Sequence, residues 1–145
     1  MSSDVYQDIK TLYEPIVAAY KEEIEELDLF KVSEGEGLYE SGLEAWVIPG
    51  RDRIDATAMR MLQHFLELNV IVFASAEDST LPQLREYGEQ VYNKLMEDIT
   101  HGGTCKWALP MLFHPGYMQV QGVTTVGVLM QYTCHFTQLF NLPSS

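Results

Sequence analysis

The segment at residues 126–137 constrains the fold more than any other part of this sequence, because its side chains alternate in character. Apolar residues occupy every second position, namely Val126, Val128, Met130, Tyr132, Cys134 and Phe136. Small or polar residues fill most of the positions beside them, namely Thr125, Gly127, Gln131, Thr133, His135 and Thr137. Successive side chains of an extended strand point to opposite faces, so this pattern predicts a long strand with one buried face and one polar face.

A second long strand is predicted from about residue 60 to residue 74, and two shorter strands precede it. In the long segment, one face holds Leu66, Leu68, Val70 and Val72, and the other holds Glu67, Asn69, Ile71 and Phe73. The shorter strands are expected at residues 29–32 and 43–48, and the second of them ends at Pro49-Gly50. Long strands with one polar face normally pair in antiparallel fashion.

Two segments have the three-to-four-residue spacing of apolar side chains that predicts an amphipathic helix. In the first, the apolar positions are Val5, Ile9, Leu12, Ile16, Tyr20, Ile24 and Leu27. The second covers about residues 81–99, with a stripe of Leu84, Gly88, Val91, Leu95 and Ile99. Thr80 and Gln83 form a capping box at its start, and Gly102 is expected to end it in a left-handed conformation.

These elements predict an α+β fold in one domain spanning residues 1–145, with a mainly antiparallel sheet packed by two helices. The predicted order is helix, strand, strand, long strand, helix, long strand. Three stretches lie between the elements. We expect an exposed loop at residues 33–42, a polar connection at residues 51–55, and a partly ordered excursion at residues 103–122, which prolines and glycines interrupt.

The charge of the chain restricts its partners. The formal net charge is −12, and residues 1–44 carry 12 acidic side chains against three lysines. This balance argues against a protein that binds nucleic acid or an anionic membrane, because both surfaces would repel it. No segment approaches the ~20 consecutive apolar residues of a membrane span, so no membrane partner is expected. The two cysteines are too few for a disulfide framework, which indicates a reducing compartment.

Few residues suggest catalysis or metal binding. His101, Cys105 and His114 lie close together in sequence, with Cys134 or His135 as further ligands, but their spacing matches no standard zinc pattern. Cys134 and His135 are neighbours on a predicted strand, so they point to opposite faces and form no thiol–base pair. The chain also has no phosphate-binding glycine loop, nucleophile turn or HExxH motif. We therefore expect no metal, no cofactor and no enzyme activity.

Assembly is better supported than catalysis. Arg51, Asp52, Arg53 and Asp55 carry both signs of charge within five residues. Such a group most often makes exposed ion pairs, but it can also pair with the same group on a neighbouring subunit. These four residues are our candidate subunit interface. The neutral polar face of the last strand is a second assembly signal, because exposed strands pair with other chains.

Several segments, taken in order, resemble the tail terminator proteins of long-tailed bacteriophages. They are residues 44–50, the strand at residues 65–73, the helix at residues 81–99 and the strand at residues 123–132. The resemblance implies an N-terminal helix, a mainly antiparallel sheet and a non-enzymatic protein of the virion. It implies a ring, expected to be a hexamer, that assembles in the host cytoplasm, caps the tail tube and docks the head-side connector or stopper protein. DNA then passes through the channel without specific binding.

Two other interpretations stay open at this point. The first is another neck or tail-completion protein of the virion, built on a similar sheet. The second belongs to a different class: a small cytosolic enzyme or ligand-binding α+β domain, which is expected to be a monomer or dimer in solution.

Overall fold

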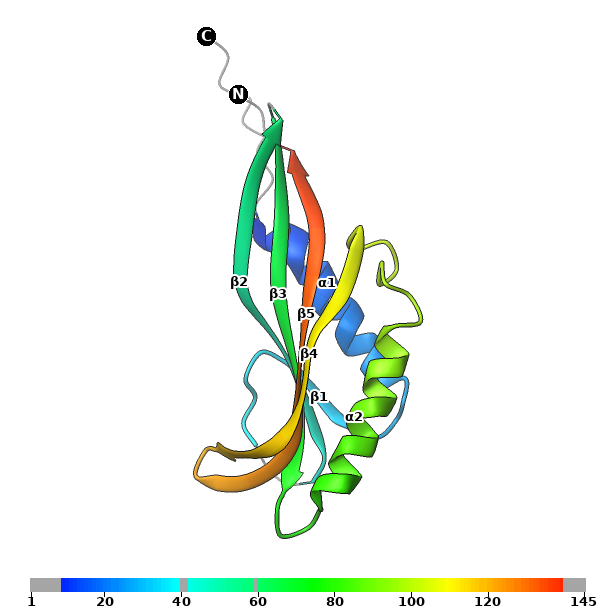
Figure 1. Cartoon of the computed structure of the whole chain (residues 1–145), viewed down its shortest axis with the longest axis vertical. Helices are drawn as coiled ribbons and strands as arrows, with labels where there is room; N and C mark the ends of the chain where they lie inside the picture. Colours follow the sequence, from blue (N-terminus) through cyan, green and yellow to red (C-terminus); the bar gives the residue numbers. More distant parts are fainter. Residues whose placement is uncertain (1–8, 40–41, 59, 140–145) are drawn as a thin grey trace.

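The computed structural model describes residues 9–39, 42–58 and 60–139, and it has an α+β fold (Figure 1). Its elements in chain order are α1 (Ile9–Glu25), β1 (Lys31–Glu34), β2 (Glu44–Ala58), β3 (Met61–Ser75), α2 (Leu81–Leu95), β4 (Trp107–Val120) and β5 (Val123–Leu139). The five strands form one sheet in the order β1-β2-β3-β5-β4. β1 pairs with β2 in parallel, and the other three pairings are antiparallel. The α+β class is confirmed, whereas the sheet is mixed and the predicted element order is only partly matched.

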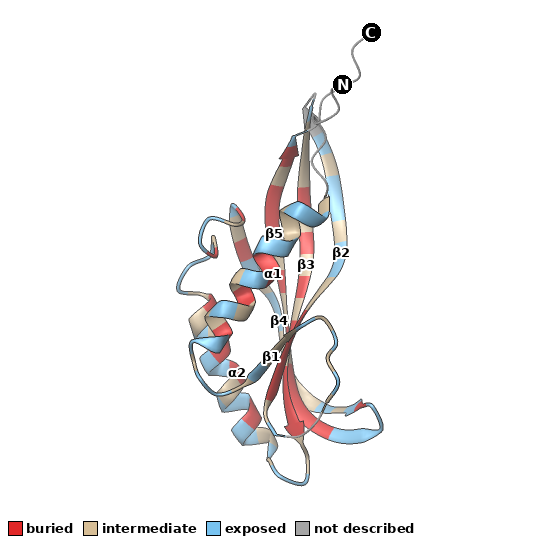
Figure 2. Cartoon of the chain, turned by 180° about the vertical axis from the view of Figure 1, so that it is seen from behind, coloured by how far each residue is buried: buried red, intermediate tan, exposed pale blue. Residues whose placement is uncertain are grey.

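Both helices pack on the same face of the sheet, as Figure 2 shows from behind. They bury the central part of each predicted stripe, with Ile16, Tyr20 and Ile24 from α1 and Leu84, Gly88, Val91 and Leu95 from α2, whereas Ile99 is exposed and Val17 is buried without having been predicted. α2 approaches the sheet closely at Gly88, where a Cβ atom would lie 2.9 Å from Cγ2 of Val128. Pro15 lies inside α1 without ending it, and Val5 falls outside the described residues.

The start of α2 is predicted correctly and its end is not. The side chain of Thr80 accepts a hydrogen bond from the Gln83 N–H, and the Gln83 side chain accepts one from the Thr80 N–H, as in a capping box. The helix ends at Leu95, earlier than predicted. Gly102 is left-handed, with φ of +72°, but it lies in the loop before β4, where Asp98 accepts its N–H.

β2 continues past Pro49-Gly50, so residues 51–55 belong to a strand and not to a polar connection. β1 pairs only with Glu44–Val47, which leaves the rest of β2 as an edge of the sheet. An edge strand tolerates a proline and charged side chains, because its outer backbone groups need no partner strand. A β-bulge between Pro49 and Asp52 absorbs the irregularity.

The opposite edge strand is β4, which occupies most of the region predicted as a partly ordered excursion. Pro110 and Pro115 hide the strand period in the sequence, and a second bulge lies between Pro110 and Leu112. Pairing with β5 orders this segment, since each interruption is tolerated at an edge. β5 itself lies between β3 and β4, so the predicted polar strand is not an exposed edge.

Among the described residues, no helix covers the second face of the sheet. One end of this face carries a small cluster of Trp46, Phe73 and Val120, with Tyr39, Ile48, Ile71 and Met118 packed around it. Phe73 is fully buried in this cluster, although its position in the strand places it on the face that carries both polar and apolar residues. Neither described helix is long and apolar enough to cross a membrane.

Candidate functional site

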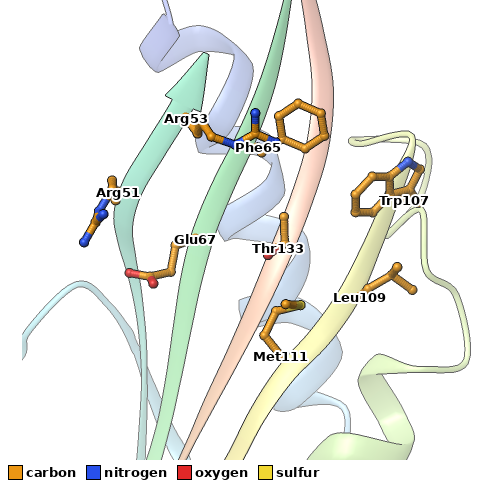
Figure 3. A pocket seen from close by; sticks show the side chains of 8 residues that line it. All are labelled: Arg51, Arg53, Phe65, Glu67, Trp107, Leu109, Met111 and Thr133. Carbon is orange, nitrogen blue, oxygen red and sulfur yellow. The ribbon is translucent and has the colours of Figure 1, made fainter. Parts of the chain in front are cut away.

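A hollow of about 520 Å³ lies on the uncovered face of the sheet, across strands β2, β3, β5 and β4 (Figure 3). The side chains that line it are Arg51, Arg53, Phe65, Glu67, Trp107, Leu109, Met111 and Thr133. Paired residues of neighbouring strands point to the same face, which places Arg53 beside Phe65 and brings Trp107 into the same row. The hollow therefore joins residues that are far apart in sequence.

A row of stacked side chains crosses the hollow. The guanidinium carbon of Arg53 lies 4.2 Å from the centre of the Phe65 ring. Phe65 stacks on His135 with ring centres 4.7 Å apart, and His135 lies 5.1 Å from the Trp107 ring. Nδ1 of His135 donates to the carbonyl oxygen of His64 at 3.0 Å, which holds the imidazole in place. The row is thus a largely aromatic surface, and a hydrogen bond to the backbone of β3 fixes its His135 ring.

The β4 side of the hollow is apolar and open to solvent. Leu109 is 45% exposed and Met111 is 66% exposed. Met111 lies in the bulge between Pro110 and Leu112, and a bulge of this kind changes the direction of a side chain. Exposed methionine beside tryptophan is typical of adaptable binding surfaces.

The β2 side of the hollow is basic. Arg51 lies in the β2 bulge between Pro49 and Asp52, and within the described residues no carboxylate forms an ion pair with it. Gly50, beside Arg51, lies against the side chain of Glu67, whose Oε2 would be 2.6 Å from a Cβ atom at this position. The bulge therefore presents a guanidinium group that is free to bind a partner.

The four predicted interface residues do not form one patch. Arg53 pairs with Asp55 on the exposed face. Asp52 points to the helix-covered face, where its Oδ2 lies 2.6 Å from Nδ1 of His64. Arg51 and Arg53 lie at the hollow, so an interface role remains a proposal for them, whereas Asp52 has a partner inside its own chain.

No pattern in the sequence predicts the polar network around His64. His64 is fully buried, and its Nε2 lies 2.8 Å from Oε1 of Gln138. Its ring stacks on Phe136 with centres 4.6 Å apart. Because Asp52, His64 and Gln138 come from three strands, only the strand pairing brings them together.

Among the described residues, those considered as metal ligands do not come together in one site, although Cys105 and Cys134 are hydrogen-bonded to each other. Nδ1 of buried His101 lies 2.9 Å from a carboxylate oxygen of Glu23 on α1. Cys105 is buried, and His114 is exposed on β4. Across the described part of the chain, no three His, Cys, Asp or Glu side chains are arranged to hold a metal ion.

Two thiols and a phenol form a buried cluster beneath α1. Oη of Tyr20 lies 3.4 Å from Sγ of Cys134. A hydrogen bond with Cys105 and burial raise the pKa of Cys134, and the same hydrogen bond lowers the pKa of Cys105. Burial raises the pKa of Tyr20. Cys134 is therefore a protonated packing group. Cys134 faces α1, while His135 lies on the uncovered side of the sheet against Trp107, as the alternating pattern predicts.

No protein-family model matches this chain, and no curated protein sequence matches it.

Proposed function

We propose that this chain is a non-enzymatic structural protein of a bacteriophage virion. In this proposal it is a tail terminator whose copies form a ring, expected to be a hexamer, that caps the tail tube and docks the head-side connector. The observation that carries the proposal is the uncovered face of the sheet, where a basic and apolar hollow lies opposite the helical layer.

The chemistry of the hollow supports protein–protein assembly. Aromatic residues, arginine and methionine are enriched at protein interfaces, and Trp and Arg contribute most often to the residues that dominate binding energy. Trp107, Arg51 and Met111 provide these groups around a stacked row. A row that is ordered before binding lowers the entropic cost of association.

The charge of the chain supports the proposed passage of DNA. Each copy has a formal net charge of −12, so a ring of copies surrounds its channel with negative charge. Such a wall repels phosphates, and DNA slides past without specific binding. The proposal includes no metal, cofactor or membrane partner.

The experiment that tests the proposal is electron microscopy of particles from a phage that lacks this protein. We expect tail tubes of uncontrolled length, separate from filled heads, and we expect rings at the end of tails when the protein is supplied again. Tails of normal length that fail only to join heads would instead assign the chain to another neck or tail-completion role. Intact particles would contradict any role in the tail or neck.

A further inference from the structure

The loop between β1 and β2 presents a large apolar side chain beside a carboxylate. Leu38 is 75% exposed, more than any other large apolar side chain among the described residues. Glu36 is also exposed, and Glu34 precedes it at the end of β1. This cyan loop in Figure 1 therefore offers solvent an acidic segment with one apolar side chain.

Hydrogen bonds from the β4–β5 turn hold the loop in this arrangement. Oε1 of Gln121 accepts the backbone N–H of Tyr39 at 2.9 Å, and its Nε2 donates to the carbonyl oxygen of Gly37 at 2.9 Å. Gly37 and Tyr39 are thereby attached to the body of the protein, while Glu36 and Leu38 remain exposed. A segment ordered in advance loses little entropy when it binds.

Gly37 lets the loop lie close to the sheet. A Cβ atom at this position would lie 3.0 Å from Oγ of Ser33 and 3.2 Å from Nε1 of Trp46. Both contacts are tighter than most side-chain contacts, so a larger residue at position 37 would have to displace Ser33 and Trp46 slightly.

We infer that the Glu36–Leu38 segment of one copy inserts into the hollow of a second copy. Leu38 matches the apolar side of the hollow, where Met111 and Leu109 are exposed beside Trp107. Glu36 matches Arg51, which has no ion-pair partner within the described residues. The inference rests on the proposed ring, to which it adds the two surfaces that join its subunits.

Charge restricts how two such copies approach each other. With a net charge of −12 on each copy, most pairs of surfaces repel. The hollow carries Arg51 and Arg53 beside Glu67, and Arg53 already pairs with Asp55, so Arg51 is the cation that Glu34 and Glu36 of the loop meet in this contact. Because the loop and the hollow are different surfaces, the contact can repeat head to tail from copy to copy, and it closes a ring when the rotation between neighbouring copies divides a full turn evenly.

The first test uses two charge reversals in the full-length chain, Arg51→Glu and Glu36→Arg. Sedimentation velocity and native mass spectrometry measure self-association of the wild type and each variant. We expect each reversal to weaken association at least about tenfold, because like charges then face each other in the contact. Glu86→Arg, on an exposed position of α2, is the matched control and is expected to leave association unchanged.

The second test mixes the two reversed proteins in equal amounts. Each loop then meets a hollow of opposite charge on the other variant, so association returns and the oligomers contain both variants in strict alternation. The Arg51→Glu, Glu36→Arg double variant is expected to associate with itself. Circular dichroism of each variant checks that its fold is intact.

Three results would overturn the inference: a wild type that stays monomeric at every concentration, reversals without effect, or a mixture that fails to associate. Binding of the hollow to the tail tube protein in place of a second copy would overturn it as well. The tail phenotype is measured separately. Overlong tails together with a mixture that does not associate would keep the proposed function and place the subunit contact elsewhere.

Discussion

The two faces of the sheet share the same strands but have different environments. On β3, Leu66, Leu68, Val70 and Val72 face the helices and are almost completely buried, whereas Phe65, Glu67, Asn69 and Ile71 face the other side and are partly exposed. Burial of one such apolar side chain contributes about 1.5–3 kcal/mol, so the covered face supplies most of the stability. The partly exposed positions of the uncovered face can therefore change with little effect on folding and are available for a partner, in contrast to the buried cluster of Trp46, Phe73 and Val120 at one end of that face.

The largest expected effect is on the covered face. Leu68→Ala removes a fully buried side chain and leaves a cavity between β3 and the helices. We expect the free energy of unfolding to fall by about 2–5 kcal/mol, measured by urea denaturation. Glu67→Ala, the next residue on the opposite face, is the control and is expected to cost less than about 1 kcal/mol. Equal losses for the two variants would contradict the comparison of the faces.

A smaller loss of stability is expected for Asp52→Ala. This variant tests whether Asp52 has a different role from the other predicted interface residues. The substitution leaves His64 buried without the carboxylate that lies 2.6 Å from its Nδ1. We expect a loss of about 1–3 kcal/mol, since a buried polar group then lacks its partner. Arg51→Ala is expected to be nearly neutral in the same urea experiment. A neutral Asp52→Ala would show that the network does not stabilise the chain.

The double variant Arg51→Glu, Arg53→Glu tests the uncovered face alone. Exposed ion pairs contribute only ~0–1 kcal/mol, so the thermal midpoint of the isolated chain is expected to stay within about 2–4 °C of the wild type. Calorimetry measures this midpoint, and complementation of tails measures assembly, which we expect to fail. Unfolding of the variant would instead show that these arginines stabilise the folded chain.

The smallest effect concerns the loop at the rim of the covered face. Hydrogen bonds from the Thr100 side chain and from the backbone N–H groups of Gly102 and Thr100 lower the pKa of Asp98 from 3.8 to about 2. A lowered pKa in the folded state stabilises the protein above pH 4, and this contribution is lost as the pH falls toward 2. Asp98→Asn is therefore expected to lower the thermal midpoint near neutral pH, with the difference from wild type disappearing at about pH 2. A difference in thermal midpoint that does not change with pH would show that the lost stability comes from the shape of the Asp98 side chain and not from its charge.

Local sequence patterns correctly predicted the elements whose formation depends on residues close together in the chain. The capping box of Thr80 and Gln83 forms as expected, and the alternating segments become β3 and β5. The same reasoning ended β2 too early and missed β4, because prolines and bulges disturb the period there. An edge strand takes its order from one neighbouring strand, and that pairing is not visible in a local pattern.

The candidate site was predicted only in part. Arg51 and Arg53 do lie on an exposed surface, beside a stacked row that no sequence pattern indicates. Phe65 and His135 are 70 positions apart in the chain and stack only because β3 and β5 pair in that register. Asp52 was grouped with its sequence neighbours, but the alternation of the strand turns it toward His64.

The helical stripes, the alternation of the central strands and the acidic charge can be predicted without a structure, because they depend on residues close together in the chain or on composition alone. Three features emerge only from the folded chain: the face of the sheet that the helices cover, the side chains that meet in the hollow, and the charged residue on β2 that has no ion-pair partner among the described residues, Arg51. Strand order, register and bulges place side chains in space, and these depend on contacts between residues far apart in the chain. A prediction made from neighbouring residues in the sequence therefore identifies helices and strands, but it does not identify the surface that these elements form together.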